Sequence, residues 1–299
     1  MKNILLIGGT GFLGSAIAGE LARRSVVSGT TINLTLPTRR RERAKHLLVL
    51  PTASVVEADV HDPATLTKLM RGQDAVISLV GILRGDFLRA HAELPAKIAA
   101  AANATGVRRL VHVSALKASA DAPSDYLRSK AAGEAALKAA ALDLTIVRPS
   151  VIFGRGDSFL TLFAQLAAIA PFFPLACADA RFQPVWVGDV AATVADSLTN
   201  AESIGKTYDL GGPRVYALRE LVAYAARMSG HPRAVIGLPH LLAWLQAWAM
   251  EFIPNGPMTR DNLRSMQIDS VCDESGTPGG ALPFGREPTS LEAVAPTYL

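Results

Sequence analysis

Cysteine is scarce in this chain. Only two of the 299 residues are cysteine, Cys177 and Cys272, and they lie too far apart in the sequence to indicate a disulfide framework or a clustered metal site. No other metal-binding motif is visible. We therefore expect no bound metal, and the low cysteine content fits a reducing compartment.

A membrane-spanning run is also missing. Residues 159–176 are apolar but contain Pro171 and Pro174, and the apolar stretch from Leu238 to Ile253 falls short of the roughly 20 residues that a spanning helix needs. The first strand-like run begins at Asn3, which leaves no room for a signal or transit peptide in this sequence. We expect a cytoplasmic protein, with a peripheral contact at the inner membrane as the alternative.

Neither sign of charge dominates the chain. The 30 Lys and Arg residues exceed the 26 Asp and Glu residues by four, a balance that does not indicate a nucleic-acid surface, so we expect no nucleic-acid partner. Part of the excess lies in one run, Arg39, Arg40, Arg41, Arg43 and Lys45. Such a run favours a local anion site, and the alternative is the solvated start of a basic helix.

Strand-like and helix-like segments alternate through the first half of the chain. The β-rich runs are residues 4–7, 32–36, 55–58, 75–80, 110–113 and 145–147, and the helical patterns between them are residues 12–24, 63–71, 87–105 and 124–141. Pro95 is expected to kink or break the third helix. This alternation predicts an α/β fold, a Rossmann-type doubly wound parallel sheet with right-handed crossovers.

The alternation of strand-like and helix-like segments ends after Pro149, where loops rich in proline, glycine and aromatic residues begin. We predict a dinucleotide-binding core over residues 1–150 and a smaller, interleaved substrate-side region over residues 151–272, parts of which return to the core. Within that region we expect a helix at residues 159–169, a strand at 182–187 and a helix starting near Asp189. Residues 273–299 read as an irregular tail.

A glycine-rich run follows the first strand and opens the first helix. Its members are Gly8, Gly9, Thr10, Gly11, Phe12, Leu13 and Gly14. Glycine at these spacings permits a tight turn, a close approach of backbone to a pyrophosphate and close helix–strand packing, and the helix N–H groups face the anion. The position in a strand–turn–helix unit raises a weak motif to a strong prediction of dinucleotide binding, against the alternative of a glycine-rich turn without a ligand.

The end of the second strand predicts which dinucleotide is bound. An acidic residue there would accept a hydrogen bond from a ribose 2′-OH, whereas arginine would bind a 2′-phosphate. The sequence has no acid at this point, and Arg39 is the best-placed cation, with Thr38 as a neutral donor and Arg40 as a second cation. We therefore expect NADP(H) rather than NAD(H).

The next two strand ends supply further candidate contacts. After the third strand, Asp59 can accept a hydrogen bond from the adenine amino group and Val60 can cover the ring, although Asp59 could equally cap a helix. After the fourth strand, Val80 and Gly81 are expected beside the cofactor ribose, where Gly81 lets the backbone pass closely.

Tyr126 and Lys130 lie four residues apart on a predicted helix and therefore project from one face. A nearby cation lowers the pKa of a phenol from about 10 towards a value suited to proton transfer at neutral pH. Lys130 could also hold the nicotinamide ribose. The alternative is an ordinary surface pair, but the preceding Rossmann pattern favours function.

These residues resemble the extended or atypical branch of the short-chain dehydrogenase/reductase superfamily, which is related to nucleotide-sugar epimerases. The resemblance covers most of the chain and is carried by the glycine run, Asp59, the Tyr126–Lys130 pair and the segments 148–154, 185–190 and 208–213. The strings at 37–40, 91–95, 114–116 and 148–154 look closest to bacterial relatives of the nucleotide-binding accessory subunit of respiratory complex I, the alpha-subcomplex subunit nine family.

The resemblance implies tightly held NADPH, a cofactor contact at Pro149, and Tyr126 as the acid/base residue. Active members place a Ser or Thr just past the fifth strand to polarise the substrate carbonyl. Ser114 is the candidate here, but it is expected one or two positions before that slot, which leaves Ala115 or Leu116 in it. Loss of such a donor can cost two or three decades in rate.

Several functions therefore stay open. The first is an NADPH-dependent reductase acting on an apolar carbonyl or quinone under Phe153, Phe159 and Trp186, or alternatively a nucleotide-sugar epimerase- or dehydratase-like enzyme. The second is an assembly protein that holds NADPH as a structural cofactor and contacts a respiratory complex or membrane edge through the helix from Leu238 to Ile253, unless that helix is buried within the chain. The third is an NADPH-sensing regulator.

Overall fold

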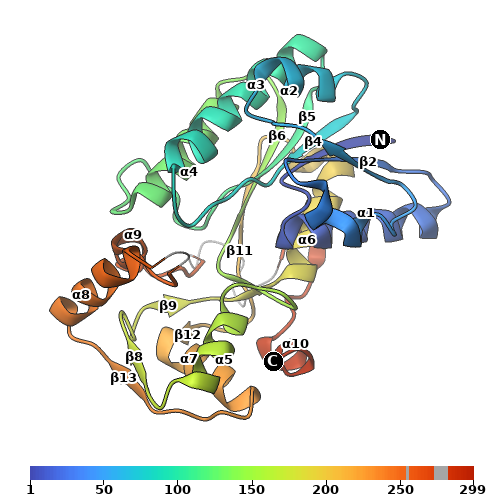
Figure 1. The fold of residues 1–299 in the computed structure, drawn as a ribbon. Helices are drawn as coiled ribbons and strands as arrows, with labels where there is room; N and C mark the ends of the chain where they lie inside the picture. The colour runs from blue at the N-terminus through green and yellow to red at the C-terminus, as the bar shows by residue number, and fades with distance from the viewer. Residues whose placement is uncertain (254–255, 273–281) are drawn as a thin grey trace. The chain divides into compact units, whose positions relative to one another are not determined.

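The computed structural model describes residues 1–253, 256–272 and 282–299. Two compact units interleave along the chain (Figure 1). The first consists of residues 1–120, 129–148 and 190–208, and the second of residues 121–128, 149–189 and 209–299.

A seven-stranded sheet forms the centre of the first unit. Its strands are β1 (Asn3–Ile7), β2 (Asn33–Thr38), β3 (Ala53–Glu57), β4 (Ala75–Ser78), β5 (Arg109–Val113), β6 (Asp143–Pro149) and β11 (Thr207–Leu210). Their order is β11-β6-β5-β4-β1-β2-β3, and the pairings from β3 to β6 are parallel. The order reverses between β1 and β4, and ligands of such sheets bind outside the carboxyl ends of the strands at this point. The predicted Rossmann-type fold is confirmed.

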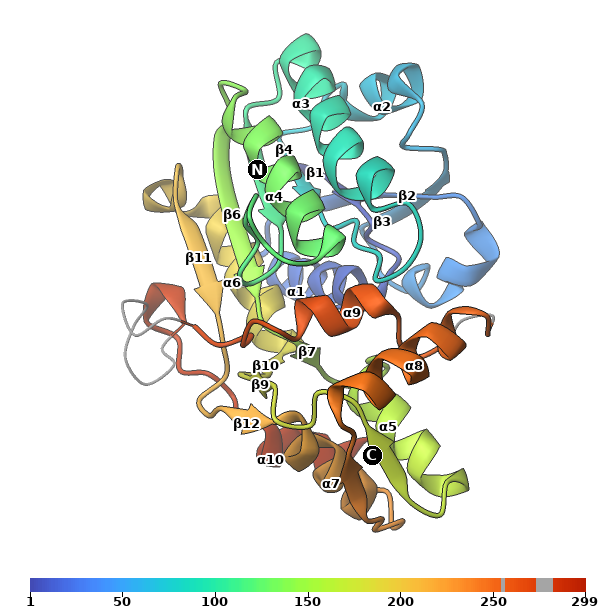
Figure 2. The ribbon, with the colours of Figure 1, turned by 90° about the vertical axis from the view of Figure 1, so that its left-hand side faces the viewer.

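Helices cover both faces of this sheet (Figures 1 and 2). One face carries α1 (Phe12–Ser28) and α6 (Val187–Thr199), which are joined by a 2.8 Å ion pair between Arg24 and Asp196. The other carries α2 (Pro63–Met70), α3 (Leu94–Thr105) and α4 (Asp125–Lys138). The apolar residues of these three helices and of the sheet form one buried cluster, which includes Leu5, Leu66, Val76, Ile98, Leu110 and Leu137.

Local chemistry explains where several helices begin. Asp62 caps α2 by accepting from the Thr65 N–H, and Pro63 occupies the first helical position, where no N–H donor is needed. Pro95 lies in the first turn of α3 for the same reason. The helix is not broken there: residues Arg89–Glu93 form a π-turn, η2, which runs directly into α3, and Glu93 and Leu94 keep helical dihedral angles.

The second unit is built from short strands and helices. Three two-stranded pairs occur: β7 (Ile152–Phe153) with β10 (Val185–Trp186), β9 (Arg181–Phe182) with β12 (Tyr216–Ala217), and β8 (Phe173–Leu175) with β13 (Val235–Gly237). Helix α5 (Leu160–Ile169) packs on α7 (Leu218–Met228) around a buried apolar cluster. The single strand expected at 182–187 is wrong, because Pro184, which has no N–H, separates β9 from β10 and Val187 already begins α6.

The C-terminal part of this unit contains α8 (His240–Glu251), α9 (Arg260–Ser265) and α10 (Leu291–Val294). Of the expected irregular tail, residues 273–281 lie outside the described residues. The rest, 282–299, holds two short 3₁₀ turns and α10, and Leu291 and Ala295 are buried. No helix within residues 1–253, 256–272 and 282–299 combines the length and apolarity needed to cross a bilayer.

Candidate nucleotide site

The glycine run forms the turn between β1 and α1. Gly8 has a φ of +87°, a conformation that favours glycine, and a Cβ there would lie 3.1 Å from the Val80 nitrogen. A Cβ on Gly14 would lie 2.4 Å from the Gly8 carbonyl oxygen, so the helix can pack on the turn only with glycine at this position. Gly11 is the N-cap of α1, and no side chain caps the helix N–H groups. The start of α1 can therefore bind an anion.

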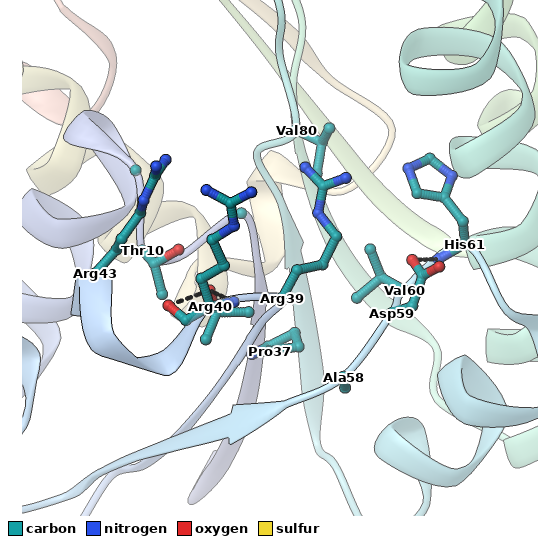
Figure 3. A pocket seen from close by; sticks show the side chains of 13 residues that line it. Thr10, Pro37, Arg39, Arg40, Arg43, Ala58, Asp59, Val60, His61 and Val80 are labelled. Atoms are coloured by element: carbon teal, nitrogen blue, oxygen red, sulfur yellow. Dashed lines mark hydrogen bonds between the residues drawn. The ribbon is translucent and has the colours of Figure 1, made fainter. Parts of the chain in front are cut away.

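A cavity of about 580 Å³ opens beside this turn, at the carboxyl ends of β1 to β4 (Figure 3). We call it the strand-end cavity. It is lined by Gly8, Thr10, Gly11, Pro37, Thr38, Arg39, Arg40, Arg43, Ala58, Asp59, Val60, His61 and Val80. Nine of the residues expected to contact the cofactor are thus brought together: Gly8, Thr10, Gly11, Thr38, Arg39, Arg40, Asp59, Val60 and Val80.

Three arginines give the cavity its charge. Arg39 directly follows β2. Arg40 precedes the 3₁₀ helix η1 (Arg41–Leu47), and Arg43 lies in its first turn. In the part of the chain that the structure describes, no carboxylate forms an ion pair with any of the three. Uncompensated guanidinium groups around a cavity are suited to a phosphate.

Asp59 and His61 form the opposite wall of the cavity (Figure 3). The Asp59 carboxylate accepts from the His61 N–H at 2.9 Å. Burial and the nearby cations, of which Arg89 acts most strongly, lower the pKa of His61, whereas Asp59 raises it. A neutral imidazole is therefore favoured there, and its Nδ1 atom is buried without a hydrogen-bond partner.

Lys130 lies beside the loop that follows β4. Its Nζ atom donates to the Val80 carbonyl at 3.3 Å and to the Val113 carbonyl at 3.4 Å, and it would lie 3.3 Å from a Cβ on Gly81. Burial lowers the pKa of Lys130 to about 8, against an opposing effect of Glu134. The ammonium group thus contacts the same loop that supplies Val80 to the strand-end cavity.

Ser114 follows β5 and is buried next to Glu134. Its hydroxyl lacks a well-aligned hydrogen bond, but it lies close enough to help Arg148 lower the pKa of the Glu134 carboxyl, which burial alone would raise. Arg148 binds this carboxylate through two hydrogen bonds of 2.7 and 2.6 Å. Ser114 therefore points towards an ion pair between α4 and β6.

Tyr126 and Pro149 belong to the second unit. Tyr126 lies in the first turn of α4, where the Asp261 carboxylate accepts its backbone N–H at 3.1 Å and that of Asp125 at 2.7 Å. The Tyr126 side chain is half-buried, and burial raises the pKa of its phenol to about 12. Pro149 is the last residue of β6.

The expected cofactor contacts and the lining of the strand-end cavity differ at several residues. Six expected residues do not line it: Phe12, Leu13, Gly14, Gly81, Lys130 and Pro149. Gly14 instead packs closely against the backbone of Gly8 and Gly9. Arg43 and His61 are lining residues that were not assigned a contact. A signal for Arg43 was present, because it belongs to the basic run that predicts an anion site; His61 has no comparable signal.

The sheet, the glycine turn and the cavity at the strand ends together define a dinucleotide-binding Rossmann protein. A family model described as NAD(P)H-binding matches residues 8–157, about half of the chain. The chain belongs to this NAD(P)H-binding family.

The chain is also similar in sequence to curated proteins, and in fold to solved structures. NADH dehydrogenase (ubiquinone) 1 alpha subcomplex subunit 9, mitochondrial, of Rattus norvegicus is 31% identical over 301 residues, which cover 96% of this chain and 77% of that protein. A (4-alkanoyl-5-oxo-2,5-dihydrofuran-3-yl)methyl phosphate reductase of Streptomyces griseus is 30% identical, with coverage of 94% and 95%. The fold matches that of an NADPH-dependent quinone oxidoreductase from Escherichia coli complexed with NADPH, with a TM-score of 0.77, 22% identity and coverage of 99% and 100%.

Proposed function

We propose that this protein is an NADP(H)-dependent oxidoreductase of the short-chain dehydrogenase/reductase type that reduces an apolar carbonyl or quinone. The observation that carries the cofactor choice is the set of three arginines, Arg39, Arg40 and Arg43, around a cavity whose single acidic lining residue is Asp59. A 2′-phosphate would place about two negative charges against these cations, whereas the 2′-hydroxyl of NAD(H) would leave them uncompensated.

The chemistry of Tyr126 and Lys130 suits a reductive reaction. NADPH, when bound, supplies a hydride. At neutral pH the phenol of Tyr126 is protonated, because its pKa is raised to about 12, and it can donate that proton to a carbonyl oxygen. Lys130 carries a positive charge below pH 8 and can hold a ribose hydroxyl beside Val80. Ser114 points at Glu134 and offers no help to the carbonyl, so we expect slow turnover.

Titration with NADPH and NADH tests the cofactor choice. Arg39→Ala and Arg43→Ala should each lower the affinity for NADPH about ten- to hundredfold and leave that for NADH unchanged, because each removes a charge-assisted hydrogen bond to the 2′-phosphate. Arg41→Ala is the matched control, since Arg41 lies in the same basic run but does not line the cavity. Equal affinities of the wild-type protein for both nucleotides would contradict the proposal.

Turnover is a separate test. Oxidation of bound NADPH by a panel of quinones and apolar carbonyls should be seen with the wild-type protein and lost in Tyr126→Phe, which keeps the ring but has no proton to donate. NADPH affinity should be the same in both proteins. Tight NADPH binding without turnover across the panel would instead favour a structural or sensing role of the cofactor.

A second function is favoured by the surface of α8. The helix faces the protein with Ala243 and Ala247, and its large apolar residues point outwards; Leu241, Leu242, Trp244, Leu245, Trp248 and the following Phe252 and Ile253 are all exposed. Leu241 is 76% and Phe252 72% exposed. These exposed fractions favour contact with a partner over burial within the chain.

We propose that this face of α8 rests in the interfacial region of a membrane. Between Leu238 and Met250 the chain has no Asp, Glu, Lys or Arg residue, and two tryptophans, which favour the membrane–water interface, lie on the exposed side. The guanidinium of Arg260 lies 5.4 Å from the Trp244 ring and is paired with the Glu251 carboxylate. The complex I subunit relative supports a location at a respiratory membrane.

Sedimentation with vesicles of phosphatidylethanolamine and phosphatidylglycerol tests the membrane contact. We expect the wild-type protein to sediment with the vesicles and the double variant Trp244→Ser, Trp248→Ser to remain in the supernatant while still folded. Val26→Ser with Val27→Ser removes two apolar residues from the end of α1 that are more exposed than the two tryptophans, and it should have no effect. Failure of the wild-type protein to bind vesicles would contradict the membrane contact and leave a protein partner as the occupant of this face.

A further inference from the structure

His91 is a buried histidine for which the proposed reaction has no use. It lies in the π-turn η2, is 1% exposed, and does not line the strand-end cavity. A π-turn inserted before an α-helix is uncommon and is frequent at functional sites. The question is what holds this imidazole in the interior of the first unit.

Two hydrogen bonds fix the ring and its tautomer. The Ile82 N–H donates to Nε2 at 2.9 Å, so this nitrogen carries no proton. Nδ1 therefore carries the proton and donates to the Ser129 hydroxyl at 2.9 Å. Burial and the charge of Lys130 lower the pKa of His91 to about 3, which keeps the imidazole neutral at physiological pH.

The backbone around His91 is also closely packed. A Cβ on Gly133 of α4 would lie 2.0 Å from the His91 carbonyl oxygen and 3.0 Å from the Pro95 ring, so only glycine lets α4 approach η2 this closely. The Phe87 ring stacks on the imidazole with centroids 5.7 Å apart. The imidazole therefore has a fixed position between the loop after β4, which it contacts at Ile82, and helix α4, which it contacts at Ser129.

The loop after β4 and this part of α4 both lie on the nucleotide side of the sheet. Ile82 belongs to the loop after β4, which supplies Val80 to the strand-end cavity. Ser129 is the neighbour of Lys130, whose ammonium group donates to the Val80 carbonyl. The loop and the start of α4 are thus joined twice, once through Lys130 and once through His91.

We propose that His91 is a positioning residue that holds the Val80–Gly81–Ile82 loop and Lys130 in register for the nicotinamide-ribose half of the cofactor. This inference rests on the proposed binding of NADP(H), because it assigns the loop to that half. The arginine end of the strand-end cavity, which would take the 2′-phosphate, shares no hydrogen bond with His91.

Binding of two probes to His91→Leu tests the role. NADPH engages both halves of the site, whereas adenosine 2′,5′-bisphosphate engages the arginine end alone. Leucine leaves the Ile82 N–H and the Ser129 hydroxyl without their partner, so we expect NADPH affinity to fall about tenfold or more and affinity for the bisphosphate to stay within about twofold. His91→Gln, whose amide can both accept and donate, should restore most of the NADPH affinity.

His112→Leu is the matched control. His112 is also a buried histidine near Lys130, but both of its ring nitrogens lack hydrogen-bond partners, so its loss should not change NADPH affinity. An equal loss of affinity for both probes in His91→Leu, or no loss for either, would overturn the positioning role. If the wild-type protein binds neither probe, the proposed function itself fails, which is a different result.

Discussion

At the scale of single residues, the effect of replacing a glycine of α1 by alanine depends on the space around that glycine. Gly14 and Gly19 lie in the same helix, five residues apart. A Cβ on Gly14 would meet the backbone of Gly8 and Gly9 at 2.4 to 2.6 Å, whereas a Cβ on Gly19 would have no atom within 4 Å. Backbone atoms cannot move aside as a flexible side chain can, so the two positions should respond in opposite ways.

We expect Gly14→Ala to lower the free energy of unfolding by about 2 to 4 kcal/mol, because the added methyl group forces α1 away from the glycine turn. NADPH binding should be lost with it. Gly19→Ala should instead raise the free energy of unfolding by about 0.5 to 1 kcal/mol, since alanine loses less backbone entropy in a helix. Urea unfolding of the two variants measures both effects, and a destabilised Gly19→Ala would contradict this reasoning.

At the scale of elements, the start of α4 is supported by a distant helix. Asp261, in the first turn of α9, accepts the backbone N–H groups of Asp125 and Tyr126 and so caps the helix that carries the proposed proton donor. Helix α9 has its own capping box, formed by Thr259 and Asn262, which leaves the Asp261 carboxylate available for α4. The position of Tyr126 therefore depends on a residue 135 positions later in the chain.

Asp261→Ala should lower the free energy of unfolding by about 1 to 2 kcal/mol, because two helix N–H groups lose their acceptor. If Tyr126 is the proton donor, kcat for quinone or carbonyl reduction should fall while the dissociation constant for NADPH stays the same. Asp269→Ala removes a similar bond, to the Arg181 N–H at 2.9 Å, and should affect stability but not kcat. A kcat loss of equal size in Asp269→Ala would argue against a specific role of Asp261.

At the scale of the whole molecule, the buried Lys130 connects stability to pH. Its pKa is about 8 in the folded protein and near 10.5 when the chain is unfolded. Between these values the unfolded chain binds a proton that the folded protein does not, so this group makes the folded state more stable as the pH rises from 8 to 10.5. Below pH 8 the ammonium group is present in both states and its burial costs stability.

The difference in the free energy of unfolding between the wild-type protein and Lys130→Met should report this titration. We expect the difference to shift in favour of the wild type by up to about 3 kcal/mol between pH 7 and pH 10.5, because methionine does not titrate. Urea unfolding without nucleotide, at steps of half a pH unit, measures it. A difference that stays constant with pH would mean that Lys130 is not desolvated.

Much of the first unit follows from local sequence. The alternation of strand and helix patterns, the glycine turn after β1 and the basic run after β2 all depend on neighbouring residues, and the structure shows the expected strands and helices at these places. The π-turn before Pro95 also has a local cause, because proline has no N–H to donate to the preceding turn. The strand expected at 182–187 is absent for the same kind of reason, because Pro184 has no N–H to donate and separates β9 from β10.

Sequence alone therefore determined the fold class and the dinucleotide turn, because the spacing of glycines and apolar residues reflects constraints within a few residues of each position. Tertiary structure decided which cations of the basic run reach the cavity, that His91 joins the β4 loop to Ser129, and that Asp261 caps α4. It also decided that α8 turns its alanines inwards and its tryptophans outwards. Those features depend on partners far away in the chain, and no local pattern encodes which distant residue will be the neighbour.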